Sequence, residues 1–446
     1  MRKPDEIKKE ILEKVEEYYK SAYPETPFEP GKTKIDNSGP LRNAEEFKSL
    51  VESALSGRWT QGKYAQEFEK KISDYISTNH AIFVNSGSSA NLIALSTLTS
   101  STIGDKRIKR GDEVISVAAA FPTTVNPIVQ LGAIPVFLDI EPLETGRYNI
   151  DCSRLEDAIS EKTKAIFLAH TLGNPFNLEK ILEIKEKYNL WLIEDCCDAL
   201  GSKYKEKNVG TYGDLSTISF YPAHHITTGE GGAVLTNNGK LWRIAHTFRN
   251  WGRDCWCPPA KDNSCGKRFG WQFGTLPFGY DHKNAYTEFG YNLKGTELHA
   301  AVGLAQLSKA EDFEKRRQEN FDYLYENLER YQDRIILPQH LPEAKPSWFG
   351  FPISIRKNAK FSREDLTSYL ESHNIMIRPL FCGNITRQPS FQNNPDVEYR
   401  VVGNLENCDQ TMYRTFWIGV QPNITNEKRE YMAKVFDLFF NNPSHK

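Results

Sequence analysis

The sequence predicts an α/β protein in which a large domain built on a mainly parallel sheet precedes a smaller α+β domain. Short apolar segments alternate with helix-like segments from about residue 81 to residue 194, as in parallel sheets that are buried on both faces. After about residue 315 this alternation gives way to a long charged helix and mixed elements. The 446 residues, 39% of them hydrophobic, are enough to bury a large core.

The elements can be placed in chain order from the spacing of apolar residues. Ile7, Ile11 and Val15 recur at helical spacing and predict an N-terminal helix. Further elements are listed here by type: helices near 47–55, 68–76, 363–373 and 427–440, and strands near 81–84, 113–117, 135–138, 164–169, 190–194 and 375–380. We therefore expect an N-terminal helical extension (1–40), a large domain (41–315) and a small C-terminal domain (316–446).

Charge and hydropathy exclude several classes of function. Lys and Arg number 56 and Asp and Glu 58, so no charge excess favours nucleic acid or an anionic membrane surface. The N-terminus begins with a charged amphipathic segment, and no apolar run reaches the roughly 18 residues of a membrane span. We expect a soluble, cytoplasmic protein.

Several expected strands are followed by residues that suit a ligand, and ligands of parallel sheets bind beyond the carboxyl ends of the strands. Gly87 and Ser88 open a helix, whose free amide groups can bind phosphate. Phe121 and Asp195 each follow a strand. Taken singly, each has a structural alternative. Gly87 and Ser88 could belong to an ordinary serine-capped helix, Phe121 could be a core residue, and Asp195 could be a helix N-cap.

The segment from Ser219 to Gly232, SFYPAHHITTGEGG, closely resembles the cofactor-anchoring segment of sugar aminotransferases of the fold-type I pyridoxal phosphate class. In that family the sixth residue is a lysine that forms an imine with pyridoxal phosphate, and here it is His224. The family lysine lies five residues after the phosphate serine and five before the first glycine of the turn, and counting from Ser219 or from Gly229 gives position 224 both times. Histidine can move a proton but cannot form a lasting imine. The resemblance implies an aspartate aminotransferase-like fold and an untethered cofactor.

The same resemblance implies a set of cofactor contacts. Asp195 would pair with the pyridine nitrogen, Asn174 would reach the ring hydroxyl, and Phe121 would stack on the ring. Asn292 would enter the phosphate site from a neighbouring subunit, which implies a homodimer with shared active sites. The full expected set is Gly87, Ser88, Phe121, Asn174, Asp195, Ser219 and Asn292.

Three residues are expected to do the chemistry. His224 occupies the reactive position and is the expected base, whereas the adjacent His225 is interpreted as a packing or hydrogen-bonding residue. Asp198 would adjust the ring hydroxyl and Tyr221 would stabilise an intermediate. A helix cap is the alternative for Asp198, and wall packing is the alternative for Tyr221.

Cysteine is the second diagnostic feature. Of eight cysteines, three crowd into the polar loop 255–265, namely Cys255, Cys257 and Cys265. Disulfides are a poor explanation in a cytosolic chain. With Cys197 as a fourth ligand the spacing is C-x57-C-x-C-x7-C, and Cys196 is a rival for that place. Four thiolates suit a [2Fe–2S] cluster or zinc, and zinc is the weaker interpretation because the paired C-x-x-C knuckles are missing.

Histidine in place of lysine, together with this cysteine spacing, resembles the CDP-4-keto-6-deoxy-D-glucose 3-dehydrases of lipopolysaccharide O-antigen and dideoxysugar synthesis. The resemblance implies pyridoxamine phosphate, which condenses with the C4 ketone of a nucleotide-linked 4-keto-6-deoxyhexose while His224 removes a proton and the C3 hydroxyl leaves. A [2Fe–2S] cluster would relay electrons from an NADH-dependent flavin and iron–sulfur reductase.

Two other functions stay open on the sequence. One is a cluster-free, lysine-less dehydratase of the GDP-4-keto-6-deoxymannose type. The other is a nucleotide-sugar aminotransferase-like binding protein with a structural zinc ion. The sequence does not distinguish a CDP-linked from a TDP-linked substrate.

Overall fold

The structure is a computed structural model that describes residues 2–258 and 261–443. A few residues of the predicted segments lie outside the described residues: Met1 of the N-terminal extension, Pro259 and Ala260 of the cysteine loop, and residues 444–446 at the end of the small domain.

The large domain is organised around one sheet with the strand order β1-β9-β8-β5-β4-β2-β3-β14. Its strands are β1 (His80–Val84), β2 (Glu113–Val117), β3 (Ile134–Leu138), β4 (Thr163–Ala169), β5 (Trp191–Asp195), β8 (Leu215–Ser219), β9 (Gly232–Thr236) and β14 (Arg400–Val401). Among these described strands β9 alone runs in the direction opposite to that of the others. The predicted strands and the mainly parallel sheet are confirmed.

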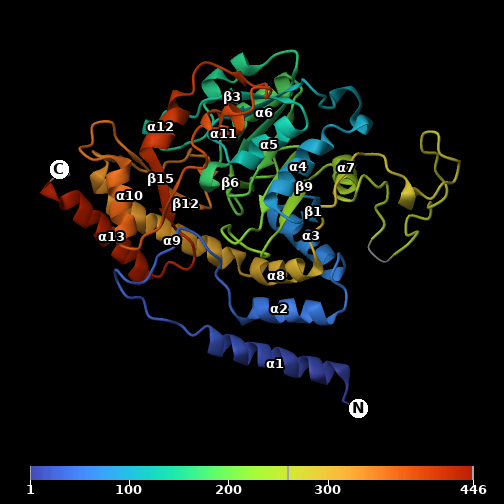
Figure 1. Cartoon of the computed structure of the whole chain (residues 1–446), viewed down its shortest axis with the longest axis horizontal. Coiled ribbons are helices and arrows are strands. Elements are labelled where there is room, and N and C mark those ends of the chain that lie inside the picture. The colour runs from blue at the N-terminus through green and yellow to red at the C-terminus, as the bar shows by residue number, and fades with distance from the viewer. Residues whose placement is uncertain (1, 259–260, 444–446) are drawn as a thin grey trace.

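Helices cover both faces of this sheet (Figure 1). They are α3 (Lys63–Ile76), α4 (Gly87–Thr97), α5 (Pro122–Gln130), α6 (Leu178–Lys187), α7 (Gly239–Arg249) and α8 (Glu297–Leu307). In β1 the apolar side chains alternate, because Phe83 joins one buried cluster while Ile82 and Val84 join another. This period of two explains why the strands are apolar throughout: each face of the sheet has its own core.

The N-terminal helix α1 (Pro4–Ala22) buries none of its own residues and lies along α2 (Ala44–Leu55), which packs on α8 (Figure 1). Helix α2 begins where the side chain of Asn43 accepts a hydrogen bond from Glu45 N, and Glu46 completes the capping box. The two predicted N-terminal helices are therefore confirmed, as a layer outside the main body.

The small domain follows the long helix α9 (Ala310–Leu328), with its own sheet and core. The sheet has the order β10-β12-β15-β13, formed by Ile335–Ile336, Gly350–Ile355, Thr415–Gly419 and Ile377–Pro379. Its helices are α10 (Arg363–Ser372), α11 (Pro389–Gln392), α12 (Glu406–Arg414) and α13 (Asn426–Asn441). A third small sheet joins β11 (Ala344–Lys345), β6 (Lys203–Tyr204) and β7 (Lys207–Asn208).

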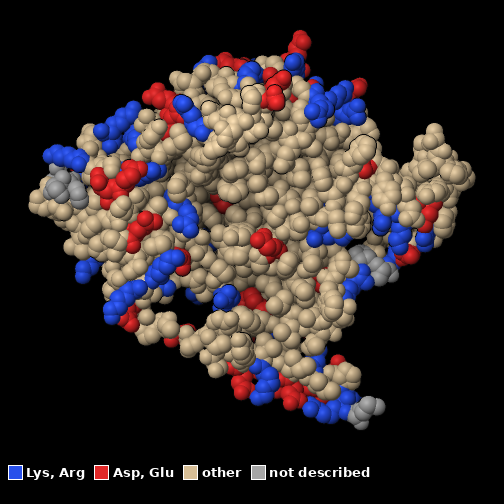
Figure 2. Space-filling view, viewed as in Figure 1, with Lys and Arg blue, Asp and Glu red and all other residues tan. Residues whose placement is uncertain are grey.

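The surface carries no strong bias of charge on the face shown in Figure 2, where basic and acidic side chains are interspersed. The formal net charge is −2. Within the described ranges, no helix is both long and apolar enough to cross a membrane.

Candidate active site and cysteine arm

A cavity of about 580 Å³ lies at the carboxyl edge of the large sheet, where the loops after β1, β2, β4, β5 and β8 meet the small domain. The predicted site residues that line it are Gly87, Ser88, Phe121, Asp195, Cys197, Asp198, Ser219, Tyr221 and His224. Residues far apart in the sequence thus converge on one site, as expected for the ends of neighbouring parallel strands.

The N-terminus of α4 forms one end of the cavity. The Oγ of Ser86 accepts a hydrogen bond from Ser89 N at 3.0 Å and caps the helix, leaving the amides of its first turn directed towards the cavity end. A Cβ at Gly87 would lie 2.5 Å from the Cβ of Ser219 and 3.1 Å from the Sγ of Cys197. Only glycine therefore allows the helix start and the Ser219 side chain to approach this closely, an arrangement that suits a phosphate group.

The carboxylate of Asp195 is 4% exposed and is held by donors from two helices and its own loop. Its Oδ2 accepts from Asn91 Nδ2 at 2.8 Å and from Thr124 Oγ1 at 2.7 Å. Its Oδ1 accepts from Cys197 N at 3.1 Å. This carboxylate is therefore fixed in the cavity that the half-exposed ring of Phe121 also lines, where it suits a protonated ring nitrogen.

His224 forms a pair with Asp198 in the cavity wall. Its Nδ1 lies 3.2 Å from Asp198 Oδ1, within ion-pair distance, although the two groups are not aligned as a hydrogen bond. Both side chains are mostly buried, and the imidazole packs against Phe349 with 5.2 Å between ring centroids. The carboxylate favours a proton on Nδ1, which leaves Nε2 as the nitrogen that can accept a proton.

The neighbouring His225 has a different environment. It is buried, and its Nε2 lies 2.9 Å from the carbonyl oxygen of Ser347. Burial, followed by the nearby positive charge of Arg317, lowers the pKa of His225 well below its usual range. His225 is thus a neutral part of the wall, and His224 is the histidine of this pair that lines the cavity.

Two predicted cofactor residues do not line the cavity in the described chain. Asn174 is buried and donates from Nδ2 to the carbonyl oxygens of Arg147 and Gln339, while its Oδ1 has no partner. Asn292 is exposed and pairs with Asn250 in an isolated bridge. The assignments of both to the cofactor stay predictions.

The sequence reasoning missed much of the opposite wall. Asn37 and Ser38 come from the N-terminal segment, and the small domain supplies further residues: Phe349, Phe381, Cys382 and Trp417. Phe381 has a φ of +45°, which is uncommon for a bulky residue, and its ring lies edge-on to that of Phe121. No local pattern announces these residues, because each comes from a segment whose periodicity reports only its own element.

The three clustered cysteines lie on a long segment between α7 and α8, residues 251–290, which we call the cysteine arm. The described part of this arm projects from the body beyond α7 (Figure 1). Two isolated bridges, Asn250 with Asn292 and Arg253 with Tyr286, join its two ends.

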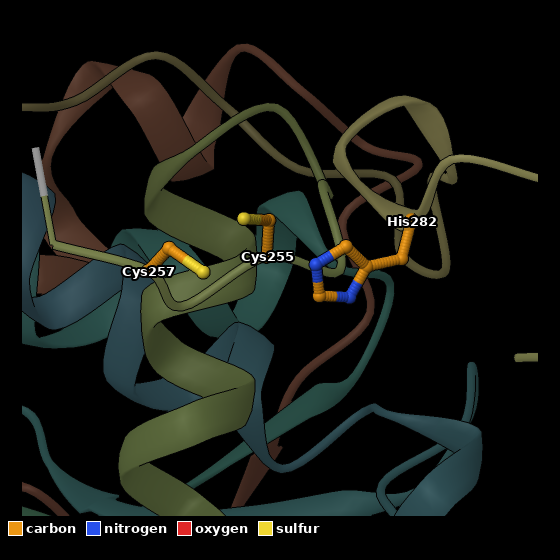
Figure 3. A group of neighbouring side chains, drawn as sticks. All are labelled: Cys255, Cys257 and His282. Carbon is orange, nitrogen blue, oxygen red and sulfur yellow. The ribbon is translucent and has the colours of Figure 1, made fainter. Parts of the chain in front are cut away.

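Within the arm, the side chains of Cys255, Cys257 and His282 are neighbours, with their ligand atoms within 4.8 Å of one another (Figure 3). The Sγ of Cys265 lies 3.7 Å from Nε2 of His282. The imidazole is 1% exposed and its Nδ1 has no hydrogen-bond partner. Three thiols and a buried, partly unsatisfied histidine fit a metal ion or cluster that takes sulfur and nitrogen ligands.

Cys257 of the arm and Cys197 of the cavity wall differ in acidity. Partial burial opposes ionisation of Cys257, but hydrogen bonds from Ser264, Cys265 and Cys255 outweigh it and lower its pKa to about 7. Burial, followed by the charge of Asp195, raises the pKa of Cys197 well above its usual range.

The expected set of four thiolates is not assembled within the described part of one chain. Cys197 lies after β5 in the cavity wall, whereas the other three cysteines lie beyond α7, and His282 takes the fourth place beside them. The rival Cys196 is also separate, in a fully buried group with His170 and Glu194. Spacing along the sequence could not distinguish these arrangements, because it does not report how far the arm extends.

The fold and the cavity together define a protein of the aminotransferase fold class, and comparison with known proteins identifies its family. Residues 40–437 match the DegT/DnrJ/EryC1/StrS aminotransferase family, and the chain belongs to this family. The predicted aspartate aminotransferase-like fold is thereby confirmed.

Two relatives and one solved structure show which members of the family the chain is similar to. The chain is 50% identical over 434 residues to the lipopolysaccharide biosynthesis protein RfbH of Salmonella typhimurium, covering 97% of this chain and 98% of RfbH. It is 48% identical over 431 residues to the dTDP-4-dehydro-2,6-dideoxy-D-glucose 3-dehydratase of Saccharopolyspora spinosa, covering 97% and 91%. A solved structure of E. coli GDP-4-keto-6-deoxy-D-mannose-3-dehydratase with bound hydrated PLP superimposes with a TM-score of 0.79, 26% identity and coverage of 90% and 98%.

The close approach at Gly87 gives a first prediction. Gly87→Ala should weaken binding of pyridoxamine phosphate at least tenfold, because its methyl group overlaps Ser219, and should cost about 1–3 kcal/mol of stability by overpacking. Cofactor fluorescence titration and thermal unfolding measure the two effects. Gly270→Ala is the control, since the nearest atom to its new methyl group, Lys267 O, would lie at an ordinary 3.9 Å; equal cofactor affinity in both variants would contradict the phosphate site.

Proposed function

We propose that the protein removes the C3 hydroxyl of a nucleotide-linked 4-keto-6-deoxyhexose, with CDP-4-keto-6-deoxy-D-glucose as the first substrate to test, in the synthesis of a lipopolysaccharide dideoxysugar. The observation that carries the proposal is His224, which stands at the lysine position of the family and lies 3.2 Å from Asp198 in the cavity. A histidine that can act as a base thus replaces the lysine that anchors the cofactor covalently, while Phe121, Asp195 and Ser219 still line the cavity.

The cavity suits pyridoxamine phosphate as the cofactor. When bound, this group supplies an amine for the substrate ketone and a ring that takes up electrons. The first turn of α4 and the Ser219 hydroxyl would hold its phosphate, and Phe121 would cover one face of the ring. Asp195 would hold the ring nitrogen protonated through a charge-assisted hydrogen bond.

His224 is the proposed proton carrier. Its Nε2 would take the proton from the cofactor carbon next to the ring, and Asp198 on the far side of the imidazole would stabilise the cation that forms. The same imidazole can return the proton to the departing C3 hydroxyl, so that it leaves as water. Tyr221, half-exposed in the cavity, is placed to donate a hydrogen bond to the sugar.

The cysteine arm is the proposed seat of a [2Fe–2S] cluster. Loss of the hydroxyl as water leaves an unsaturated product that needs two electrons and two protons to become the 3,6-dideoxy sugar. NADH supplies the electron pair, and an NADH-dependent flavin and iron–sulfur reductase would pass the electrons singly through the cluster. Cys255, Cys257 and Cys265 are the three thiolate ligands that the arm supplies.

Two residues compete for the fourth ligand position. Cys197 fits the cysteine spacing along the sequence, whereas His282 lies beside the arm cysteines in the described chain. Histidine can ligate a [2Fe–2S] centre, since two of the ligands of Rieske centres are histidines. Iron analysis of Cys197→Ser and His282→Ala separates the two assignments, because the variant that removes a ligand loses the cluster.

Subunit association completes the proposal. Asn292 and the aromatic side chains of Trp251, Tyr286 and Phe289 are exposed around the base of the arm, with Phe289 fully exposed. A large solvent-exposed aromatic group suits burial against another copy of the chain. We propose a homodimer in which Asn292 of each subunit enters the phosphate site of the other.

A cluster-free dehydratase is the second candidate, favoured by the structural likeness to the E. coli enzyme whose structure holds PLP. The three neighbouring cysteines of the arm argue against a cluster-free enzyme. The deciding experiment incubates iron-reconstituted protein, pyridoxamine phosphate, reductase and NADH with candidate nucleotide sugars. Mass spectrometry that detects loss of one oxygen identifies the substrate, and turnover that needs neither iron nor the reductase would favour the second candidate.

Removal of the base tests the proposed role of His224. His224→Asn should bind pyridoxamine phosphate normally and exchange the hydrogen next to the cofactor ring with deuterated solvent about 10²–10⁴-fold more slowly, because a proton acceptor is lost. Mass spectrometry of the released cofactor measures the exchange. His340→Asn, at an exposed histidine outside the cavity, is the control, and undiminished exchange in His224→Asn would exclude the role.

Removal of one arm thiolate tests the cluster. Cys255→Ser should lose most of the iron and acid-labile sulfide and stop reduction by NADH, yet retain cofactor binding and proton exchange, because the arm lies apart from the cavity. Wild-type protein should hold about two of each per chain. Cys152→Ser, at a cysteine outside both arm and cavity, should keep its iron; full iron content in Cys255→Ser would remove this ligand from the proposal.

Mixed subunits test the shared active site. A subunit carrying His224→Asn and a subunit carrying Asn292→Ala are each expected to be inactive as homodimers. Random mixing gives hybrid dimers with one intact site, so about a quarter of wild-type activity should return. Activity that stays at the level of the unmixed variants, although hybrids are present by native mass spectrometry, would contradict the exchange of Asn292 between subunits.

A further inference from the structure

Trp256 lies between Cys255 and Cys257 in the sequence and so separates two of the candidate ligands of the arm. Because the three residues are consecutive, whatever holds the indole ring also limits the movement of the two thiols. The ring is half-buried, and its contacts come from helix α7 and from the arm itself. These contacts therefore show how the cysteine-bearing part of the arm is kept in place.

The contact with the body of the protein is made by Arg243 of α7. Its guanidinium carbon lies 3.3 Å from the centroid of the Trp256 ring. Tryptophan is the most favourable aromatic ring for a cation, and the planar guanidinium can also stack on it. Helix α7 packs on α4, whose first turn forms one end of the cavity. The cation–π pair thus joins the cysteines of the arm to a helix that is fixed relative to the cavity.

Within the arm, the indole of Trp256 contacts two further rings. It meets His282 edge-on, with 5.6 Å between ring centroids, and Trp271 with 6.2 Å. The Nε1 of Trp271 and the Nδ1 of His282 are both buried and have no hydrogen-bond partner. Unpaired buried donors beside a group of thiols suit the sulfur atoms of a bound cluster, which accept hydrogen bonds.

The charge of Arg243 lies close enough to act on such a cluster. Its guanidinium carbon is at most about 9 Å from the His282 ring centroid, the sum of the 3.3 Å and 5.6 Å distances through Trp256, which is about one Debye length. Asp254 attracts this charge, but no carboxylate of the described chain lies within ion-pair distance of it. Reduction adds negative charge to an iron–sulfur centre, so a cation at this distance favours the reduced form.

We propose that Arg243 is a positioning residue for the cysteine arm: through Trp256 it holds the thiols in place, and its fixed charge raises the reduction potential of the cluster. The inference rests on the proposed function, because it takes the arm as the seat of a [2Fe–2S] cluster. It adds to that function a role for α7, which keeps the cluster easier to reduce by a one-electron donor.

A reductive titration of the iron-reconstituted, full-length protein tests the effect of the charge, with the electron paramagnetic resonance signal of the reduced cluster as the readout. Arg243→Met should shift the equilibrium towards the oxidised form about tenfold, or about 59 mV for a one-electron couple, because the cation is gone. Arg243→Lys should stay close to the wild-type potential, because the charge remains. Lys240→Met removes an exposed cation from the first turn of the same helix and is the control.

Hydrogen–deuterium exchange of the iron-free protein tests the anchoring without any cluster. Arg243→Met and Trp256→Leu should each speed exchange of the arm amides by about twofold or more, because a contact between the arm and α7 is lost. In the Trp256→Leu background, Arg243→Met should have no further effect, since the ring under the guanidinium is gone. Lys240→Met should exchange like the wild type.

The outcomes separate the two parts of the inference from the proposed function. Unchanged arm exchange in Arg243→Met, or an equal effect of Arg243→Met with and without the Trp256 ring, would overturn the anchoring. A potential that stays at the wild-type value in Arg243→Met would overturn the effect of the charge. Wild-type protein that takes up neither iron nor sulfide would instead count against the proposed function, while exchange in the iron-free arm would still decide the anchoring.

Discussion

The buried carboxylate of Asp195 is the interaction on which the cavity depends. It accepts hydrogen bonds from Asn91 on α4, from Thr124 on α5 and from the amide of Cys197, and so ties both helices to the end of β5. Losing any one of these partners would leave a buried polar group unsatisfied, at a cost of about 1–3 kcal/mol. The helix start that suits a phosphate and the ring of Phe121 are therefore fixed relative to one another.

The preceding residue, Glu194, ties neighbouring segments to β5 on the opposite face of the strand. Its carboxylate accepts from the amides of Gly210, Tyr212 and Gly213 and lies 3.1 Å from Nε2 of His170, which stacks on Phe176. Because side chains alternate along a strand, consecutive acids can serve two different networks. The end of β5 is thus held from both sides, which limits how far Asp195 can move.

The sequence was informative where function follows from local pattern and topology. The ends of the predicted parallel strands placed Gly87 and Asp195 at one ligand site, and the resemblance to sugar aminotransferases placed Ser219 and His224 there. The structure places all four in the cavity. It was uninformative about contacts between distant segments. Strand β14 joins the sheet through a pair of residues with no apolar pattern, and Arg400 pairs with Glu113, 287 positions away. In the same way, cysteine spacing could not show that His282 lies beside the thiols of the arm.

Replacing a lysine by His224 changes more than the catalytic group. A lysine imine would hold the cofactor covalently, so a site without one depends wholly on hydrogen bonds, stacking and enclosure. The enclosure comes from three parts of the chain, since Asn37 from the N-terminal segment and Trp417 from the small domain line the same cavity as Ser219. The imidazole is freed for proton transfer, while the arm keeps the thiols outside that enclosure. In the proposed reaction, water can thus be excluded where protons move without burying the surface that must accept electrons from a partner.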